Sequence, residues 1–487
     1  MYKHTKKGKS YKSIYKHTKN NRLNKKYKSH KTKSHKTKSH KTKSHKTKSH
    51  NHISPIKLYK NELDTRLLIM PNRNETATAS IYFYFKVGSK NETPEISGIS
   101  HFIEHLIFKG SPKYPNYLDI SKTFDANGIS FNAYTSKDTT AYHYKFLSNK
   151  ENLDLICKIT SDMIFNPLMR DKDIKTERNV IVQEYNDDID DIDEFIDGKI
   201  EECLLDGHPL GRPIIGTLKT IDSINREDLI KYHKKYYRHD NLVIGFSGNM
   251  NDDYTNIINQ HFSGKSSKFL PISLQSQGVS QIIPFIDKHT ECAIDCFSKD
   301  LKQDYIHIIF KTKGDLDPMK QQYRLIKNIL GANMSSRLFV EIREKLGLVY
   351  SIKCDLTNYE EIGYFDIYTQ NQAKDTVKCI QQIFKELVKF KKYGVGEKEL
   401  NENKKNYCDL FKTEFDDIEY ENEHFASQLL LNTPIETVEK RIENINSITA
   451  DELKTVANEL FKFNKVHIIT FGKVKKNTIK KILHKFY

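Results

Sequence analysis

The chain repeats part of itself at an interval of 224 residues. Residues 220–248 and 444–472 align without a gap, and each segment reads as a turn, an amphipathic helix and a short apolar strand that ends in glycine. The beginnings of the two halves also correspond, because residues 81–86 and 305–311 are both strand-like runs followed by an acidic, proline-containing loop and a helix. The repeat therefore predicts an α+β fold built from two homologous domains.

Composition divides the chain into four segments. Residues 1–53 are a tail rich in lysine and histidine, in which Ser-His-Lys-Thr-Lys occurs four times in tandem over residues 29–48. Such a segment has too little apolar surface to offset the entropy of ordering, so we expect it to be disordered. A Ser/Gln-rich linker at 266–289 then separates the two homologous domains, which we expect at 54–265 and 290–487.

The net charge of +16 comes from the tail. The first 50 residues hold 18 lysines and one arginine without an acidic residue, so removing their +19 leaves the rest of the chain at −3. The tail could contact nucleic acid or another anionic surface, and the alternative is low-complexity sequence without a function. Mitochondrial targeting fits less well, since transit peptides are amphipathic and rich in arginine.

Cysteine usage and hydropathy bear on the compartment. The chain has seven scattered cysteines, and an odd, scattered set argues against a disulfide framework and for a reducing intracellular compartment. No run approaches the roughly 18 apolar residues of a membrane span, and no signal-peptide core is visible. We therefore expect a protein without a membrane span.

The segment His101-Phe-Ile-Glu104-His105 carries a candidate metal site. On a helix, His101 and His105 lie one turn apart on one face with Glu104 beside them, and the surrounding apolar residues fall on the opposite side. Two neutral imidazoles suit Zn²⁺, and a carboxylate beside the metal can take a proton from its bound water. The order H-x-x-E-H is one form of the metallopeptidase helix.

A third ligand is expected from residues 174–185, which also read as a helix. Glu177 and Glu184 lie two turns apart on one face, flanked by Val180 and Ile181, so both carboxylates should have a mostly apolar setting. A buried carboxylate is costly unless it is paired or binds a metal. Two histidines and one glutamate would leave the fourth position of a catalytic zinc site to water. The alternative is an exposed helix face with a coincidental spacing.

Several collinear motifs resemble the pitrilysin/insulinase superfamily of zinc metallopeptidases, and most closely its short, mitochondrial-processing-peptidase-like branch. They span most of residues 55–475 and occupy residues 98–110, 132–138, 177–184, 207–216, 236–243 and 335–351. Two departures are Gln183, where an acidic residue is common, and His239, where proline is common. Neither is a ligand position, and the basic tail lies outside the resemblance.

The resemblance implies a zinc endopeptidase with a clam-shell fold, each domain being a mainly antiparallel sheet covered by helices. It implies one Zn²⁺ per chain, held by His101, His105 and Glu184, because the second half lacks a ligand pair near residues 325–330. Glu104 would be the general base and later the general acid. Glu177 would orient one of the ligands. The expected substrates are unfolded or short peptides.

The resemblance also implies where a peptide substrate is bound. Asn132, Ala133 and Tyr134 fall on an edge strand that an extended peptide can lengthen, and an ordinary edge strand is the alternative. Arg343 and Tyr350 match a pair that binds the scissile carbonyl and, in the short branch, serves the zinc of a second subunit. We therefore expect a homodimer or a heterodimer with a related subunit. The alternative is that Arg343 is an ordinary surface charge and Tyr350 a core residue.

An acidic run, residues 187–194, directly follows the third ligand. A solvated helix face is the simplest explanation, whereas a place in the substrate chamber would favour basic peptides such as presequences. Two other classes of protein stay open: an inactive scaffold or partner subunit of the same fold, and an interaction protein that uses the basic tail.

Overall fold

The computed structural model describes residues 56–71, 77–249, 252–263, 268–273, 291–431 and 433–486. The basic tail and most of the expected linker lie outside these ranges.

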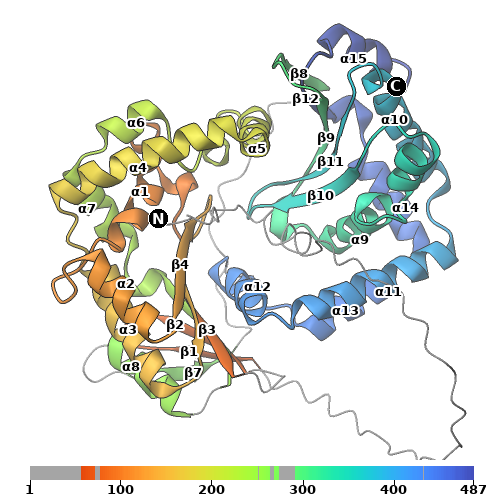
Figure 1. The fold of residues 1–487 in the computed structure, drawn as a ribbon. Coiled ribbons are helices and arrows are strands. Elements are labelled where there is room, and N and C mark those ends of the chain that lie inside the picture. The colour runs from red at the N-terminus through yellow and green to blue at the C-terminus, as the bar shows by residue number, and fades with distance from the viewer. Residues whose placement is uncertain are drawn as a thin grey trace, which may run out of the picture.

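Two sheets, one in each half of the chain, form the framework of the molecule (Figure 1). The first sheet has the order β4-β5-β3-β6-β2-β1-β7 and the second has the order β10-β11-β9-β12-β8. The strands of the first sheet are β1 (Lys57–Lys60), β2 (Arg66–Pro71), β3 (Thr78–Phe85), β4 (Ser130–Thr135), β5 (Thr140–Leu147), β6 (Leu242–Gly248) and β7 (Leu270–Ile272). Those of the second are β8 (Ala293–Phe297), β9 (Asp304–Thr312), β10 (Ile352–Asn358), β11 (Gly363–Asn371) and β12 (His467–Phe471).

The two sheets share one topology. Strands β4-β5-β3-β6-β2 correspond one by one to β10-β11-β9-β12-β8, and in both sets only the last pair is parallel. The helices that precede β6 and β12, α7 (Arg226–Tyr236) and α14 (Ala450–Leu460), are 224 residues apart at both ends. The predicted α+β class with two homologous, mainly antiparallel domains is therefore confirmed.

The first sheet continues past residue 265, into the segment where the sequence predicted a linker. Leu270–Ile272 form β7, which pairs antiparallel with β1 at the edge of the sheet. The strand is a three-residue Leu-Pro-Ile run inside a polar stretch, so the average composition of the segment hid it. The first half therefore extends to at least Ile272, and residues 274–290 lie outside the described ranges.

Helices pack on both sheets. In the first half these are α1 (Ile99–Ile107), α2 (Tyr117–Ala126), α3 (Lys150–Phe165), α4 (Asp171–Asp190), α5 (Ile192–Leu204), α6 (Leu218–Ser223), α7 and α8 (Asp252–Phe262). In the second half they are α9 (Lys320–Gly331), a π-helix (Phe339–Lys345), α10 (Thr376–Tyr393), α11 (Glu397–Glu414), α12 (Ile418–Leu430), α13 (Val438–Ser447), α14 and α15 (Lys476–Leu483).

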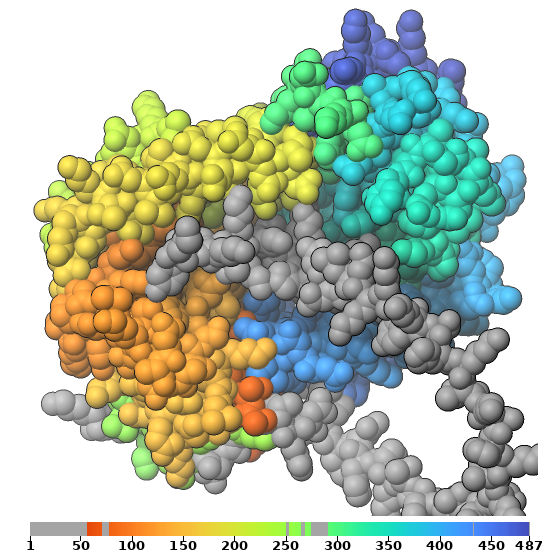
Figure 2. Space-filling view, in the orientation of Figure 1, coloured from red at the N-terminus to blue at the C-terminus, as the bar shows by residue number. Residues whose placement is uncertain are grey.

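One helix from each half crosses to the sheet of the other half. Helix α12 packs Phe425 and Leu429 into a core with Tyr84 of the first sheet. Helix α5 packs Ile200 into a core with Ile309 of the second sheet. Because α5 and α12 begin 226 residues apart, they are equivalent elements of the repeat, and the two halves exchange them reciprocally. Figure 2 shows the yellow surface of α4 and α5 meeting the green and blue surface of the second half.

This exchange predicts that truncating Phe425 destabilises the protein. The side chain is fully buried between the halves, so Phe425→Ala should lower the free energy of unfolding by about 3–5 kcal/mol. Urea denaturation followed by circular dichroism measures the change. The control is Leu410→Ala on α11, where the side chain is exposed and the change should stay within roughly 0.5 kcal/mol. Equal effects of the two substitutions would contradict the packing of α12.

No described helix has the length and apolar character needed to cross a membrane. All seven cysteines are free thiols, which agrees with the expected lack of a disulfide framework. Four of them, Cys157, Cys354, Cys379 and Cys408, are buried, and they pack as small apolar side chains in the two cores.

Candidate active site

Helix α1 carries the H-x-x-E-H motif, and its beginning is closely constrained. Gly98 has a φ of +98°, and a Cβ there would lie 2.5 Å from the carbonyl oxygen of Ile215, so the position requires glycine. The Glu92 carboxylate accepts the N–H groups of Gly98 (2.8 Å) and Ser100 (2.9 Å) at the N-terminus of the helix. The predicted apolar face is buried and consists of Ile99, Phe102, Ile103, Leu106 and Ile107.

The structure brings the three predicted ligands together, two from α1 and one from α4. The Nε2 atoms of His101 and His105 lie 3.3 Å apart, and Oε2 of Glu184 lies 3.7 Å and 3.4 Å from them. A tetrahedral ion with bonds of about 2.0–2.2 Å keeps its ligand atoms roughly 3.3–3.6 Å apart, so this donor set fits Zn²⁺. Among the described residues, no other group of three such side chains meets in this way.

The two predicted glutamates of α4 differ in their surroundings. Glu177 is 4% exposed, as the apolar setting predicted, but the Glu184 side chain is 36% exposed. Glu177 is enclosed by His105 and Lys109, whereas Glu184 lies on the open side of the site. The expectation of an apolar setting is therefore wrong for Glu184, whose side chain is partly accessible to solvent.

The pKa values of His101 and His105 are shifted in opposite directions. Burial and the neighbouring His105 lower the pKa of His101 to about 3. Burial also opposes protonation of His105, but hydrogen bonds to Glu177 and Glu184 outweigh it and raise the pKa of His105 to about 10. In the absence of a metal, these shifts favour the protonated, cationic form of His105 and the neutral form of His101. A cation that binds His105 must displace the added proton.

Glu177 orients His105. Its Oε2 lies 3.1 Å from Nδ1 of His105, and its Oε1 lies 2.6 Å from Nζ of Lys109. Burial disfavours ionisation of Glu177, but the hydrogen bonds from His105 and Lys109 outweigh it and hold its pKa below the usual value. The ionised carboxylate of Glu177 accepts a hydrogen bond from the Nδ1–H group of His105. The Nε2 atom of His105 is then directed at the other two proposed ligands.

This geometry predicts that Glu177→Gln weakens metal binding without abolishing it. The loss of a charged hydrogen-bond partner behind a ligand should reduce zinc affinity by about 10–100-fold. Competition with a chromogenic chelator measures the affinity. Asp187→Asn, an exposed carboxylate on the same helix, serves as the control and should leave affinity within about twofold. Equal affinities of the Glu177 variant and the parent would contradict the assigned role.

Glu104 lies beside the ligands and has a partner that sequence reasoning missed. Its Oε2 accepts a hydrogen bond of 2.7 Å from Oγ1 of Thr135, and burial raises its pKa. Thr135 lies within the motif at residues 132–138 and Lys109 within the motif at 98–110, one helical turn after His105, but neither residue was assigned a role from the sequence. Sequence spacing alone could have identified Lys109 as a neighbour of His105 on the same helix face. The contact between Thr135 of β4 and Glu104 of α1 depends on tertiary structure, which sequence spacing does not show.

Asn132, Ala133 and Tyr134 lie on β4, the edge strand of the first sheet within the described residues. The strand pairs with β5 along one side. Its last residue, Thr135, reaches Glu104, so the edge runs towards the candidate site. The N–H of Ala133 donates to Oδ1 of Asn132 at 2.9 Å, so a peptide that paired with this N–H would have to displace that hydrogen bond.

Arg343 and Tyr350 lie side by side in the second half. Nε of Arg343 donates to the backbone carbonyl of Tyr350 at 2.9 Å, and the guanidinium lies 5.9 Å from the centre of the Tyr350 ring. Tyr350 is 77% exposed, which excludes the alternative that it is a core residue. Tyr350 is therefore accessible to a binding partner, whereas the Arg343 side chain is 38% exposed and forms an ion pair with Glu344.

The acidic run spans the end of α4 and the beginning of α5. Most of its side chains are exposed. Asp191 caps α5, because its carboxylate accepts the N–H groups of Asp193 and Glu194. A structural role is therefore present for one member of the run, and the other acids form a solvated face.

Two family models match the chain. Residues 67–218 match the model described as Insulinase (Peptidase family M16), and residues 223–407 match the Peptidase M16 inactive domain. The boundary between the matches lies after the three predicted ligands but inside the first half, because α7, β6, α8 and β7 fall within the second match. A protein of Rickettsia felis named an uncharacterized zinc protease is 31% identical over 83% of this chain and 94% of its own length. The uncharacterized zinc protease YmxG of Bacillus subtilis is 29% identical over 83% of this chain and 96% of its own length.

Solved structures show the same fold. A protease from Helicobacter pylori superposes with a TM-score of 0.76 at 21% identity and covers 86% of this chain and 99% of its own. The periplasmic protease PqqL from Escherichia coli superposes with a TM-score of 0.75 at 17% identity, and the match covers 88% of this chain but 50% of PqqL.

Proposed function

Because this chain belongs to the insulinase (M16) family of the pitrilysin/insulinase superfamily, we propose that it is a zinc-dependent endopeptidase. The proposal is carried by the convergence of His101, His105 and Glu184 at spacings that suit one tetrahedral ion, with Glu104 alongside. Relatives named zinc proteases support it. Unfolded or short peptides are the proposed substrates.

His101, His105 and Glu184 would hold the zinc, which would lower the pKa of a bound water. A carboxylate oxygen of Glu104 accepts a proton from the attacking water and later donates it to the nitrogen of the leaving amine. Burial raises the pKa of Glu104 above its usual value, which helps the carboxylate to take up the proton. Thr135 fixes one carboxylate oxygen of Glu104, and Glu177 keeps His105 in the required tautomer.

The substrate would bind as an added strand. We propose that an extended peptide pairs along the outer edge of β4, at Asn132, Ala133 and Tyr134, and that its scissile bond then lies near Glu104. The backbone groups of a folded substrate are already paired within its own structure, so this binding mode selects unfolded chains. If the exposed acids of residues 187–194 face the bound peptide, basic residues in the substrate would be favoured.

A second subunit would complete the site. The match covers half of PqqL, so the PqqL chain contains about as many further residues as the matched part. We propose that this chain pairs with a second copy or with a related chain. Arg343 and Tyr350 of that second subunit would steady the scissile carbonyl by hydrogen bonds.

Incubation of the full zinc-loaded chain with a basic, unstructured peptide of about 25 residues tests the proposal. We expect cleavage that stops on chelation, no cleavage of the same segment inside a stably folded domain, and a dimeric mass. A dimeric protein that binds one zinc per chain and leaves the peptide intact would contradict the proposal in favour of an inactive scaffold.

A further inference from the structure

The turn between β4 and β5 positions the hydrogen-bond partner of Glu104. Thr135, the last residue of β4, is buried and donates to Glu104. The turn that follows is tight: the N–H of Ser136 donates to the carbonyl of Thr139 at 2.7 Å, and the Ser136 hydroxyl accepts the N–H of Thr139 at 3.1 Å. Any movement of this turn therefore moves the Thr135 hydroxyl.

The first half fixes one side of the turn through backbone contacts. The N–H groups of Ser89 and Lys90 donate to the carbonyls of Ser136 and Lys137 at 3.2 Å and 2.8 Å. Gly88 packs so closely that a Cβ there would lie 2.3 Å from the carbonyl oxygen of Ser136. The backbone on this side has no room to shift.

A chain of buried polar side chains connects the other side of the turn to the second half. Nζ of Lys137 donates to the carbonyl of Arg212 at 2.6 Å and lies 2.9 Å from Oε2 of Glu201 on α5. The second oxygen of Glu201 accepts a hydrogen bond from the hydroxyl of Tyr359. Tyr359 lies between β10 and β11 of the second half and is 3% exposed. One buried carboxylate thus joins the turn to the other domain.

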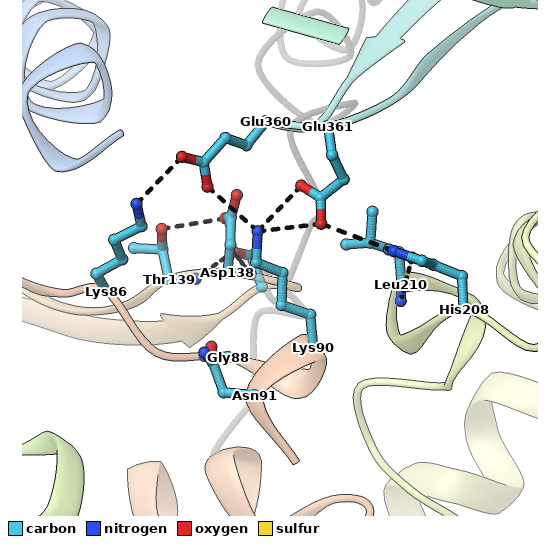
Figure 3. Close-up of polar contacts among 11 residues, drawn as sticks. Lys86, Gly88, Lys90, Asn91, Asp138, Thr139, His208, Leu210, Glu360 and Glu361 are labelled. Atoms are coloured by element: carbon cyan, nitrogen blue, oxygen red, sulfur yellow. Dashed lines mark hydrogen bonds and ion pairs between the residues drawn. The ribbon is translucent and has the colours of Figure 1, made fainter. Parts of the chain in front are cut away.

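Buried charges reinforce the same junction (Figure 3). Nζ of Lys90 lies 3.1 Å from a carboxylate oxygen of Glu361 and 3.4 Å from one of Glu360, and Lys86 lies 3.3 Å from Glu360. Figure 3 shows the two glutamates reaching from the segment between β10 and β11 towards the lysines beside Asp138. Separating the halves here would leave buried charges unpaired, so the junction is stiff.

We propose that Tyr359 of the second half is a positioning residue that keeps Thr135 directed at Glu104. The proposal rests on the peptidase function, in which Glu104 accepts and returns a proton. A misplacement of about 1 Å in a reacting group can cost up to about 100-fold in rate. The domain without a ligand group would therefore contribute to catalysis in the other domain without touching the substrate.

The direct test is Tyr359→Phe, which removes the hydroxyl and keeps the buried ring. We expect kcat to fall about tenfold, with KM and the bound zinc unchanged. Tyr84→Phe is the matched control, because its buried hydroxyl also contacts the other half, donating to Oδ1 of Asn422 at 3.4 Å. That variant should keep kcat within about twofold of the parent. The proposal would be overturned if Tyr359→Phe raised KM without lowering kcat, or if Tyr359→Phe and Tyr84→Phe lowered kcat equally.

A double-mutant cycle tests the route through Thr135. Thr135→Val should lower kcat by at least as much as Tyr359→Phe, because it removes the hydrogen bond to Glu104 itself. If Tyr359 acts through Thr135, adding Tyr359→Phe to Thr135→Val should cause no further loss. Losses that multiply in the double variant would show independent effects and overturn the proposal.

Amide hydrogen exchange gives a readout that needs no activity. In the zinc-free protein, Tyr359→Phe should speed exchange of the amides at residues 135–140, and Tyr84→Phe should not. Unchanged exchange at the turn would overturn the positioning role whether or not the protein cleaves peptides. Faster exchange in a protein that cleaves nothing would support the positioning role and overturn the peptidase function.

Discussion

Replacing Glu104 with glutamine should leave one zinc bound per chain and reduce peptide cleavage by about 10²–10⁴-fold. Glutamine keeps the shape of the side chain and can still accept the hydrogen bond from Thr135, so the helix and the ligand group should be undisturbed. The amide cannot take a proton from water, however, and the acid–base steps are lost. Initial cleavage rates and zinc content, measured on the same samples, give both quantities.

The control for this result is Glu151→Gln, an identical chemical change at an exposed position in the first turn of α3. It should cleave at the rate of the parent. A Glu104→Gln protein that retained more than about a tenth of the parent rate would rule out Glu104 as the base.

Replacing Glu184 with glutamine should have the largest effect on metal content. The carboxylate is one of the three proposed ligands and the only carboxylate among them, so zinc affinity should fall by more than the 10–100-fold expected for Glu177→Gln. Because the Glu184 side chain is 36% exposed, the substitution leaves no buried charge behind and the fold should persist. Cleavage should vanish together with the metal.

Chelator competition on Glu177→Gln and Glu184→Gln shows which of the two glutamates of α4 contributes more to zinc affinity. A Glu184→Gln protein that bound zinc as tightly as the parent would exclude Glu184 as a ligand. The same outcome for Glu177→Gln would exclude only its orienting role. Asp187→Asn on the same helix again serves as the unaffected reference.

The repeat and the ligand motif were predictable from sequence because both are local patterns. Copies of α7 and β6 recur as α14 and β12, and four residues of separation on α1 place His101 and His105 on one face whatever the tertiary fold. The third ligand is two helical turns from Glu177, which again follows from helix geometry.

The contacts that sequence reasoning missed join segments far apart in the chain. No periodicity indicates that α5 and α12 exchange partners, since an amphipathic helix does not specify which sheet it covers. The bond from Thr135 to Glu104 and the chain from Lys137 to Tyr359 arise from tertiary packing. The apolar setting expected for Glu184 failed for the same reason, because exposure depends on what lies across from a helix face.

We propose that one zinc, held by His101, His105 and Glu184, makes this chain a peptidase. Stripping the protein with a chelator and titrating zinc back while following cleavage of an unstructured basic peptide tests it most directly. We expect no cleavage before zinc is added, and we expect the cleavage rate to rise linearly with added zinc until one zinc per chain is bound. Cleavage by the fully stripped protein, or recovery that does not track the first equivalent of zinc, would contradict it.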